Sequence, residues 1–159
     1  MIWFKVIGAL ILCGSGLWGA SLLNGRASAA LRQAEGFSAL LRTVKLRVDC
    51  YAQSLPEILA ACEWRTLGDC GYRGEERPRD LEALLAGCAV YDAGSVSALR
   101  EFAAEFGRGY REEQVRACAY TLSLLEERRV ALASALPTEK KRNTTLCLAA
   151  SLGAAILLF

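Results

Sequence analysis

The stretch VIGALILCGSGLWGASLL, residues 6–23, contains eighteen residues without a charge, and the chain ends in a second uncharged stretch, LCLAASLGAAILLF, residues 146–159. An apolar helix of about 17–25 residues can cross a bilayer. The first stretch reaches that length, and the second reaches its lower limit when residues 143–145 are added, with a rise of about 25 Å against a hydrocarbon core of roughly 30 Å. We therefore expect an N-terminal transmembrane helix at 1–24 and a C-terminal one at 143–159.

Small residues recur four positions apart in the first apolar stretch. They form two pairs, Ser15 with Gly19 and Gly16 with Ala20. Because small side chains allow helix backbones to approach closely in a membrane, this spacing predicts packing against another helix.

Basic residues lie on one side of the two apolar stretches. They are Arg26, Arg32, Lys140, Lys141 and Arg142, against Lys5 alone on the other side. Basic flanks stay in the cytoplasm. The central domain, residues 25–142, is therefore expected to be cytoplasmic, with both termini outside.

The central domain has helical periodicity throughout. Apolar residues recur at steps of three and four at positions 37, 41, 44, 48 and 51, and again at positions 115, 118, 122 and 125. This pattern predicts an all-α fold, an antiparallel bundle of about five to six helices between the two transmembrane helices. Pro137 is expected to kink or break the last helix.

Local signals divide the middle of this bundle. Ser54 and Glu57 form a capping-box pattern that starts a short helix, and Asp80 can cap another. Residues 68–78 read as a loop and residues 92–95 as a turn. Gly107 is placed to end the helix before the last one.

The composition argues against catalytic, metal-binding and nucleic-acid-binding roles. The chain has no histidine, and its seven cysteines form no C-x-x-C motif. The net charge is only +2. A nucleophilic thiol such as Cys118 would have no histidine to activate it. We expect no catalytic residue, cofactor, metal, nucleic acid or small-molecule substrate.

Several segments, in order, resemble the stage III sporulation protein AB family of endospore-forming bacteria. They are residues 5–9, 31–33 with 40–41, Tyr51 with 54–57, and residues 99–114 with their Phe-Gly and Tyr-Arg-Glu-Glu-Gln elements. The similarity covers essentially the whole chain and rests on pattern and architecture. The chain departs from the family at Pro137 and in a short middle segment.

The resemblance implies a non-enzymatic platform or adaptor. The family is similar to the cytoplasmic domains of platform proteins in type II secretion and type IV pilus machines. Its members belong to a secretion-like channel complex in the mother-cell membrane facing the forespore. The implied partners are a cytoplasmic ATPase of the same operon and other membrane proteins of the complex. Position and charge suggest Glu112, Glu113 and Arg116 as partner contacts.

An exported domain is the alternative. Lys5 and the following apolar residues also resemble a signal peptide, with Ala27-Ser28-Ala29 as an A-x-A-like cleavage site. Cleavage there would leave an exported or membrane-tethered helical interaction domain.

Overall fold

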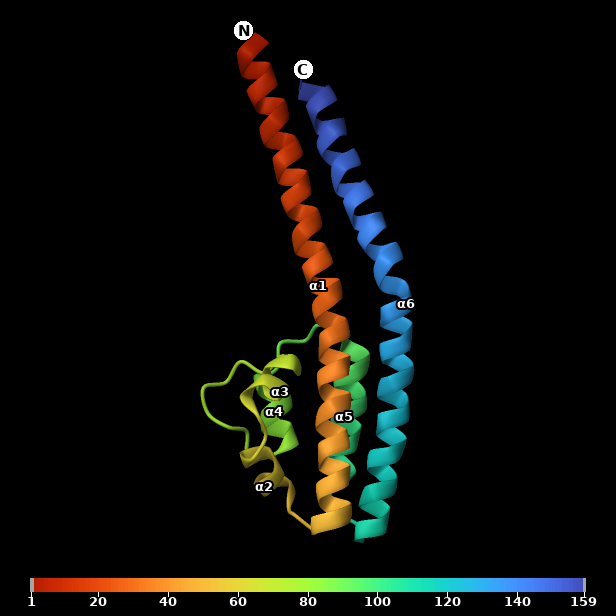
Figure 1. Cartoon of the computed structure of the whole chain (residues 1–159). Coiled ribbons are helices and arrows are strands. Elements are labelled where there is room, and N and C mark those ends of the chain that lie inside the picture. The colour runs from red at the N-terminus through yellow and green to blue at the C-terminus, as the bar shows by residue number, and fades with distance from the viewer. Residues whose placement is uncertain (1, 159) are drawn as a thin grey trace. The chain divides into compact units, whose positions relative to one another are not determined.

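The computed structural model describes the backbone of residues 2–158 and the side chains of residues 8, 11 and 14–156. It contains six helices (Figure 1): α1 Ile2–Tyr51, α2 Leu55–Ala60, α3 Trp64–Asp69, α4 Leu81–Gly87, α5 Ala93–Glu105 and α6 Arg111–Leu158. The extended pairing in this part of the chain is a single bridge between Tyr72 and Cys88. The all-α prediction is therefore confirmed.

Two long helices replace the separate terminal helices that we expected. α1 contains 50 residues and α6 contains 48, so no helix boundary occurs near residue 24 or residue 143. The predicted break at Pro137 is wrong, because α6 continues through it. A proline removes one backbone donor at a cost of about 3 kcal/mol, and the turns on either side keep their own hydrogen bonds.

The chain divides into two compact units. The helix-pair unit consists of Met1–Ala29 and Ala133–Phe159, and the bundle unit consists of Ala30–Leu132. These bounds lie several residues inside the bundle range 25–142 that we expected.

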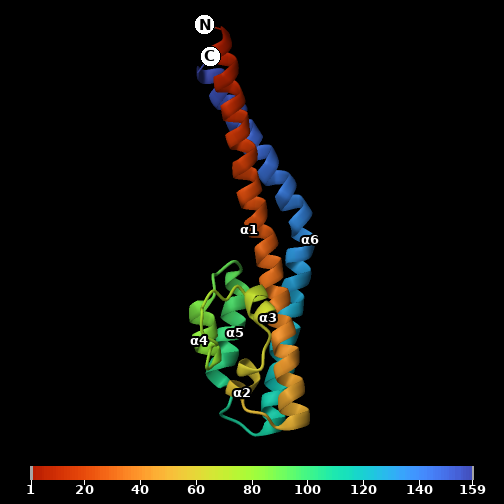
Figure 2. The same ribbon diagram turned by 60° about the vertical axis from the view of Figure 1, so that its left-hand side comes forward.

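In the helix-pair unit, the start of α1 and the end of α6 run side by side in opposite directions (Figures 1 and 2). Within the described part of the chain, no helix is both long enough and apolar enough to cross a bilayer. Several side chains of the predicted N-terminal span, at positions 1–7, 9, 10, 12 and 13, lie outside that part.

The bundle unit has a continuous apolar core. Fully buried residues come from all six helices, among them Phe37, Leu41, Leu59, Leu67, Leu84, Leu99 and Leu125. The predicted stripe of α1 is buried from Phe37 to Val48, but Tyr51 is 70 % exposed because the helix ends there. Cys62 and Cys118 are buried, as small apolar side chains often are.

Capping explains where the short helices begin. The capping box of Ser54 and Glu57 starts α2, and Asp80 starts α4 by accepting a hydrogen bond from the Ala83 amide at 2.7 Å. The predicted loop at 68–78 begins too early, since α3 continues to Asp69. The predicted turn at 92–95 is the first turn of α5, with Asp92 as its N-cap.

Candidate functional site

An open groove lies in the bundle unit where α6 begins. Its volume is about 1010 Å³. Its lining residues are Asp49, Tyr110, Arg111, Glu112, Glu113, Val115, Arg116 and Ala119. All three predicted partner contacts, Glu112, Glu113 and Arg116, therefore line the same groove.

The loop between α5 and α6 shapes one end of this groove. α5 ends at Glu105, one residue earlier than a Gly107 cap would give, because Phe106 is already extended; Gly107, with φ +87°, then turns the loop in a left-handed conformation that favours glycine. The Glu113 carboxylate accepts a hydrogen bond from the Tyr110 amide at 3.0 Å. The side chain of Gln114 donates to the Gly109 carbonyl at 2.9 Å. Glu113 therefore holds the start of α6, a structural role that position and charge alone did not reveal.

The remaining charges of the groove divide into paired and unpaired groups. Arg111 forms an ion pair with Asp49, with Nη2 and Oδ1 3.3 Å apart. Among the described residues, neither Glu112 nor Arg116 has an ion-pair partner. Tyr110 is 85 % exposed beside them. Tyrosine and arginine are enriched at protein-contact surfaces, so Tyr110 and Arg116 favour such a role for the groove.

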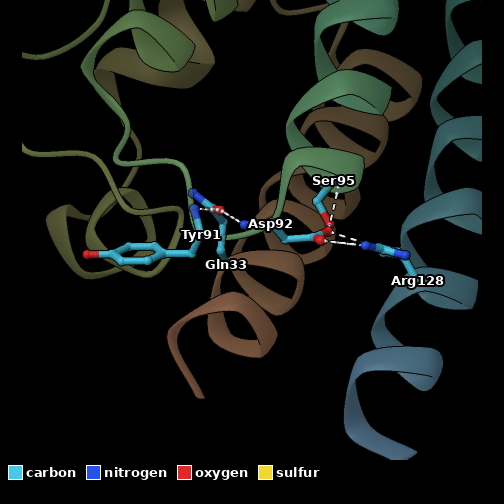
Figure 3. Close-up of polar contacts among 5 residues, drawn as sticks. All are labelled: Gln33, Tyr91, Asp92, Ser95 and Arg128. Carbon is cyan, nitrogen blue, oxygen red and sulfur yellow. Dashed lines mark hydrogen bonds and ion pairs between the residues drawn. The ribbon is translucent and has the colours of Figure 1, made fainter. Parts of the chain in front are cut away.

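A buried amide connects α1 to the loop that precedes α5 (Figure 3). Gln33 Oε1 accepts hydrogen bonds from the Tyr91 and Asp92 amides, both at 3.0 Å. Its Nε2 donates to the carbonyls of Cys70 at 2.9 Å and Ala89 at 2.7 Å. All four hydrogen-bonding positions of this side chain are used, so Gln33 sets the position of the loop.

Asp92 extends this network to α6 (Figure 3). Its buried carboxylate accepts hydrogen bonds from the Ser95 amide at 2.8 Å and from Arg128 Nη2 at 2.8 Å. Burial alone would raise the pKa of Asp92, but the hydrogen bonds from Arg128 and Ser95 outweigh it and lower the pKa to about 2. Asp92 is therefore a fixed anion at neutral pH and joins α5 to α6.

Four thiols of the bundle unit, those of Cys62, Cys70, Cys88 and Cys118, are poorly suited to nucleophilic chemistry. Burial raises the pKa of Cys88 and of Cys118 to about 11. Burial likewise raises the pKa of Cys62 and Cys70. At these raised pKa values, little thiolate exists at neutral pH. The thiolate is the reactive form of cysteine, so these thiols react slowly. Among the described residues, no group of three His, Cys, Asp or Glu side chains could hold a metal ion.

The predicted small-residue positions lie differently in the helix-pair unit. Gly16 faces α6 closely, since a Cβ atom there would lie 2.6 Å from Ser151 Oγ and 3.0 Å from the Cys147 carbonyl oxygen. Ala20 is buried, whereas Ser15 is exposed. A Cβ atom at Gly19 would lie 3.9 Å from Cys147 Sγ, an ordinary contact. The pair Gly16 and Ala20 therefore forms the contact with α6.

The predicted flanking basic residues are mostly exposed. Arg26, Lys141 and Arg142 are exposed in the helix-pair unit, where Lys140 is half-buried, and Arg32 is exposed in the bundle unit. Arg142 Nη2 lies 3.9 Å from Glu139 Oε1.

Sequence patterns missed the roles of Gln33 and Arg128. Two signals were available. Gln33 lies at a position that the apolar pattern assigns to a buried helix face, and Asp92 lies at a helix start. Neither signal identifies its partner far along the chain.

Comparison with protein-family models, with curated proteins and with solved structures finds no match to this chain.

Proposed function

We propose that this protein is a membrane-tethered, non-enzymatic platform or adaptor. One observation carries the membrane part of the proposal. In the helix-pair unit, small and polar residues lie between the helices while large apolar residues face outward.

The exposed fractions of the side chains support this arrangement. Ala20 and Ser151 are 3 % and 7 % exposed, whereas Trp18 and Ile156 are 70 % and 79 % exposed. Leu17, Leu22, Leu146 and Leu152 are also exposed. In water, a helix pair would bury its leucines and expose its serines. In a bilayer the surrounding lipid is itself apolar, so small and polar contacts hold the helices together.

Lipid is therefore the surrounding that suits this unit. An apolar surface of this kind in water would be an aggregation site or would need a partner to cover it. The basic flanks support a cytoplasmic bundle unit with both termini outside.

The adaptor part of the proposal rests on the groove and on the resemblance to the stage III sporulation protein AB family. On this basis the bundle unit meets a cytoplasmic ATPase of the same operon and other membrane proteins of a sporulation channel in the mother cell. The unpaired charges of Glu112 and Arg116 make the groove suitable for a protein contact.

Topology is tested most directly with the exposed thiol of Cys50. A membrane-impermeant maleimide should leave Cys50 unlabelled in intact cells and label it after permeabilisation. A Cys50→Ser variant provides the background. Labelling of Cys50 in intact cells, or release of the chain from vesicles by alkaline carbonate, would contradict the proposal.

Partner binding is tested by co-purification of the ATPase with the full chain from sporulating cells. The reversals Glu112→Arg and Arg116→Glu should reduce the amount captured. Glu127→Arg is the matched control, because Glu127 is an exposed glutamate of α6 outside the groove lining. Equal capture by all three variants would remove the groove from this role.

The exported alternative has its own test. Its expected cleavage site, residues 27–29, lies inside α1, where Ser28 Oγ donates to the Asn24 carbonyl at 3.0 Å. A mature protein beginning at Ala30 would establish the alternative and defeat the platform proposal.

A further inference from the structure

Charge is unevenly divided between the two units. The helix-pair unit contains five basic residues and one acidic residue, a net charge of +4. The bundle unit contains fourteen basic and sixteen acidic residues, a net charge of −2. The excess positive charge of the chain therefore belongs to the unit with the outward-facing apolar surface.

Cross-helix hydrogen bonds place this charge at one level of the helix pair. Asn143 Nδ2 donates to Asn24 Oδ1, and Asn24 Nδ2 donates to Thr144 Oγ1, both at 3.4 Å. On one side of this contact the next apolar residues are Leu23 and Leu146, both exposed. Both helices therefore change from apolar to polar at the same level.

Four basic residues follow immediately on the polar side. All four lie within about 5 Å of that level along the helix axes. We name them the basic collar: Arg26, Lys140, Lys141 and Arg142. The single acidic side chain of the unit, that of Glu139, lies 3.9 Å from Arg142 Nη2. Among the described residues, Arg26, Lys140 and Lys141 have no ion-pair partner.

We propose, on the basis of the membrane attachment proposed above, that the basic collar binds the headgroups of anionic phospholipids. The collar lies where lipid phosphates would meet the helix pair if its apolar surface were in the acyl chains. Each basic side chain near an anionic surface strengthens attraction about fivefold. The negative net charge of the bundle unit offers no competing attraction, so the lipid preference should depend on the collar.

Quenching of Trp18 by brominated lipids can measure this preference. Trp18 is 70 % exposed and six residues, roughly 9 Å, from Asn24 on the apolar side. The full chain carrying Trp3→Phe and Trp64→Phe retains Trp18 as its reporter. It is reconstituted into phosphatidylcholine vesicles that contain phosphatidylglycerol, with one or the other lipid brominated. The ratio of quenching gives the relative association constant of the two lipids.

The expected ratio favours phosphatidylglycerol by about fivefold or more at low salt and decreases at high salt. The variant R26Q/K140Q/K141Q should bring the ratio to about one. The control R65Q/R79Q/R100Q removes the same charge from exposed arginines of the bundle unit and should leave the ratio unchanged.

Each other outcome has a definite meaning. If neither brominated lipid quenches Trp18, the membrane attachment itself fails. If both lipids quench Trp18 equally in the protein whose basic collar is unchanged, the membrane attachment stands and the lipid preference is overturned. A preference that inorganic phosphate removes, where sodium chloride of equal ionic strength does not, would assign the collar to a soluble phosphate and also overturn it.

Discussion

Arg128 donates a hydrogen bond from Nη2 to Asp92 Oδ1 at 2.8 Å, and only the carboxylate is buried: the Asp92 side chain is 5 % exposed and that of Arg128 is 48 % exposed. The pair joins the first turn of α5 to α6. Because the anion is enclosed and its partner is partly hydrated, loss of Arg128 leaves a buried charge, whereas loss of Asp92 leaves an arginine that can turn to water.

The lowered pKa of Asp92 predicts that the protein loses stability in acid. The folded-state pKa of Asp92, about 2, lies below its ordinary value of 3.8. A lowered pKa stabilises the folded state above the ordinary value, and this stabilisation is lost as pH falls through the folded value. We expect a loss of about 1–2 kcal/mol between pH 4 and pH 2, discounted for the exposed partner. Urea unfolding at several pH values measures it.

The Asp92→Asn variant serves as its control. Asparagine keeps the N-cap of α5 and removes the charge, so this part of the pH dependence should disappear. An unchanged pH slope in that variant would contradict the assignment to Asp92.

Gln33→Met should destabilise the bundle unit by about 3–5 kcal/mol. Methionine has a similar shape but leaves two amides and two carbonyls without their side-chain partner. Gln114→Met is the matched substitution, since Gln114 makes a single side-chain hydrogen bond to Gly109. It should cost only about 1 kcal/mol. Equal losses in urea unfolding would show that the Gln33 contacts are dispensable.

Gly36→Ala should destabilise the bundle unit by about 1–3 kcal/mol. A Cβ atom at Gly36 would lie 2.6 Å from the backbone carbon of Asp69, so α1 or α3 must move. Gly68→Ala adds the same methyl group inside α3, where nothing lies within 4 Å. That control should be neutral or slightly stabilising, because alanine favours helix. Thermal unfolding of the two variants distinguishes them.

Gly16→Leu should separate the helix pair, whereas Gly14→Leu should not. A side chain at Gly16 meets the Cys147 carbonyl oxygen and Ser151, but nothing lies within 4 Å of a Cβ atom at Gly14. Oxidative cross-linking between a cysteine introduced at Gly19 and the native Cys147 reports on the pairing in vesicles, because a Cβ atom at Gly19 would lie 3.9 Å from Cys147 Sγ. Strong cross-linking in Gly16→Leu would argue against a close contact at that glycine.

Thiol reactivity should divide the cysteines by burial. Cys50 is exposed and should react quickly with a thiol reagent at pH 8. Cys70 and Cys118 should react only on unfolding, because they are buried and their pKa values are raised. Mass spectrometry of partly labelled protein gives the order. Early labelling of Cys118 would mean that α6 opens readily from the core.

Helix identity and helix starts could be read from the sequence. The periodicity of apolar residues placed Phe37, Leu41 and Val44 in the core, and burial confirms all three. The caps at Ser54 and Asp80 were predicted for the same reason, since capping depends on residues three positions apart. One short helical segment brings Glu112, Glu113 and Arg116 to the same groove, and their role as partner contacts stays a prediction.

Tertiary structure alone decided which distant residues meet. Gln33 contacts Asp92 across 59 positions, and Asp92 contacts Arg128 across 36. Likewise, only the pairing of α1 with α6 distinguishes Gly16, which touches Ser151, from Ser15 beside it. Short-range patterns depend on the helical repeat, so residues close together in the sequence are enough to recognise them. Long-range partners depend on how completed helices pack, which no local pattern records.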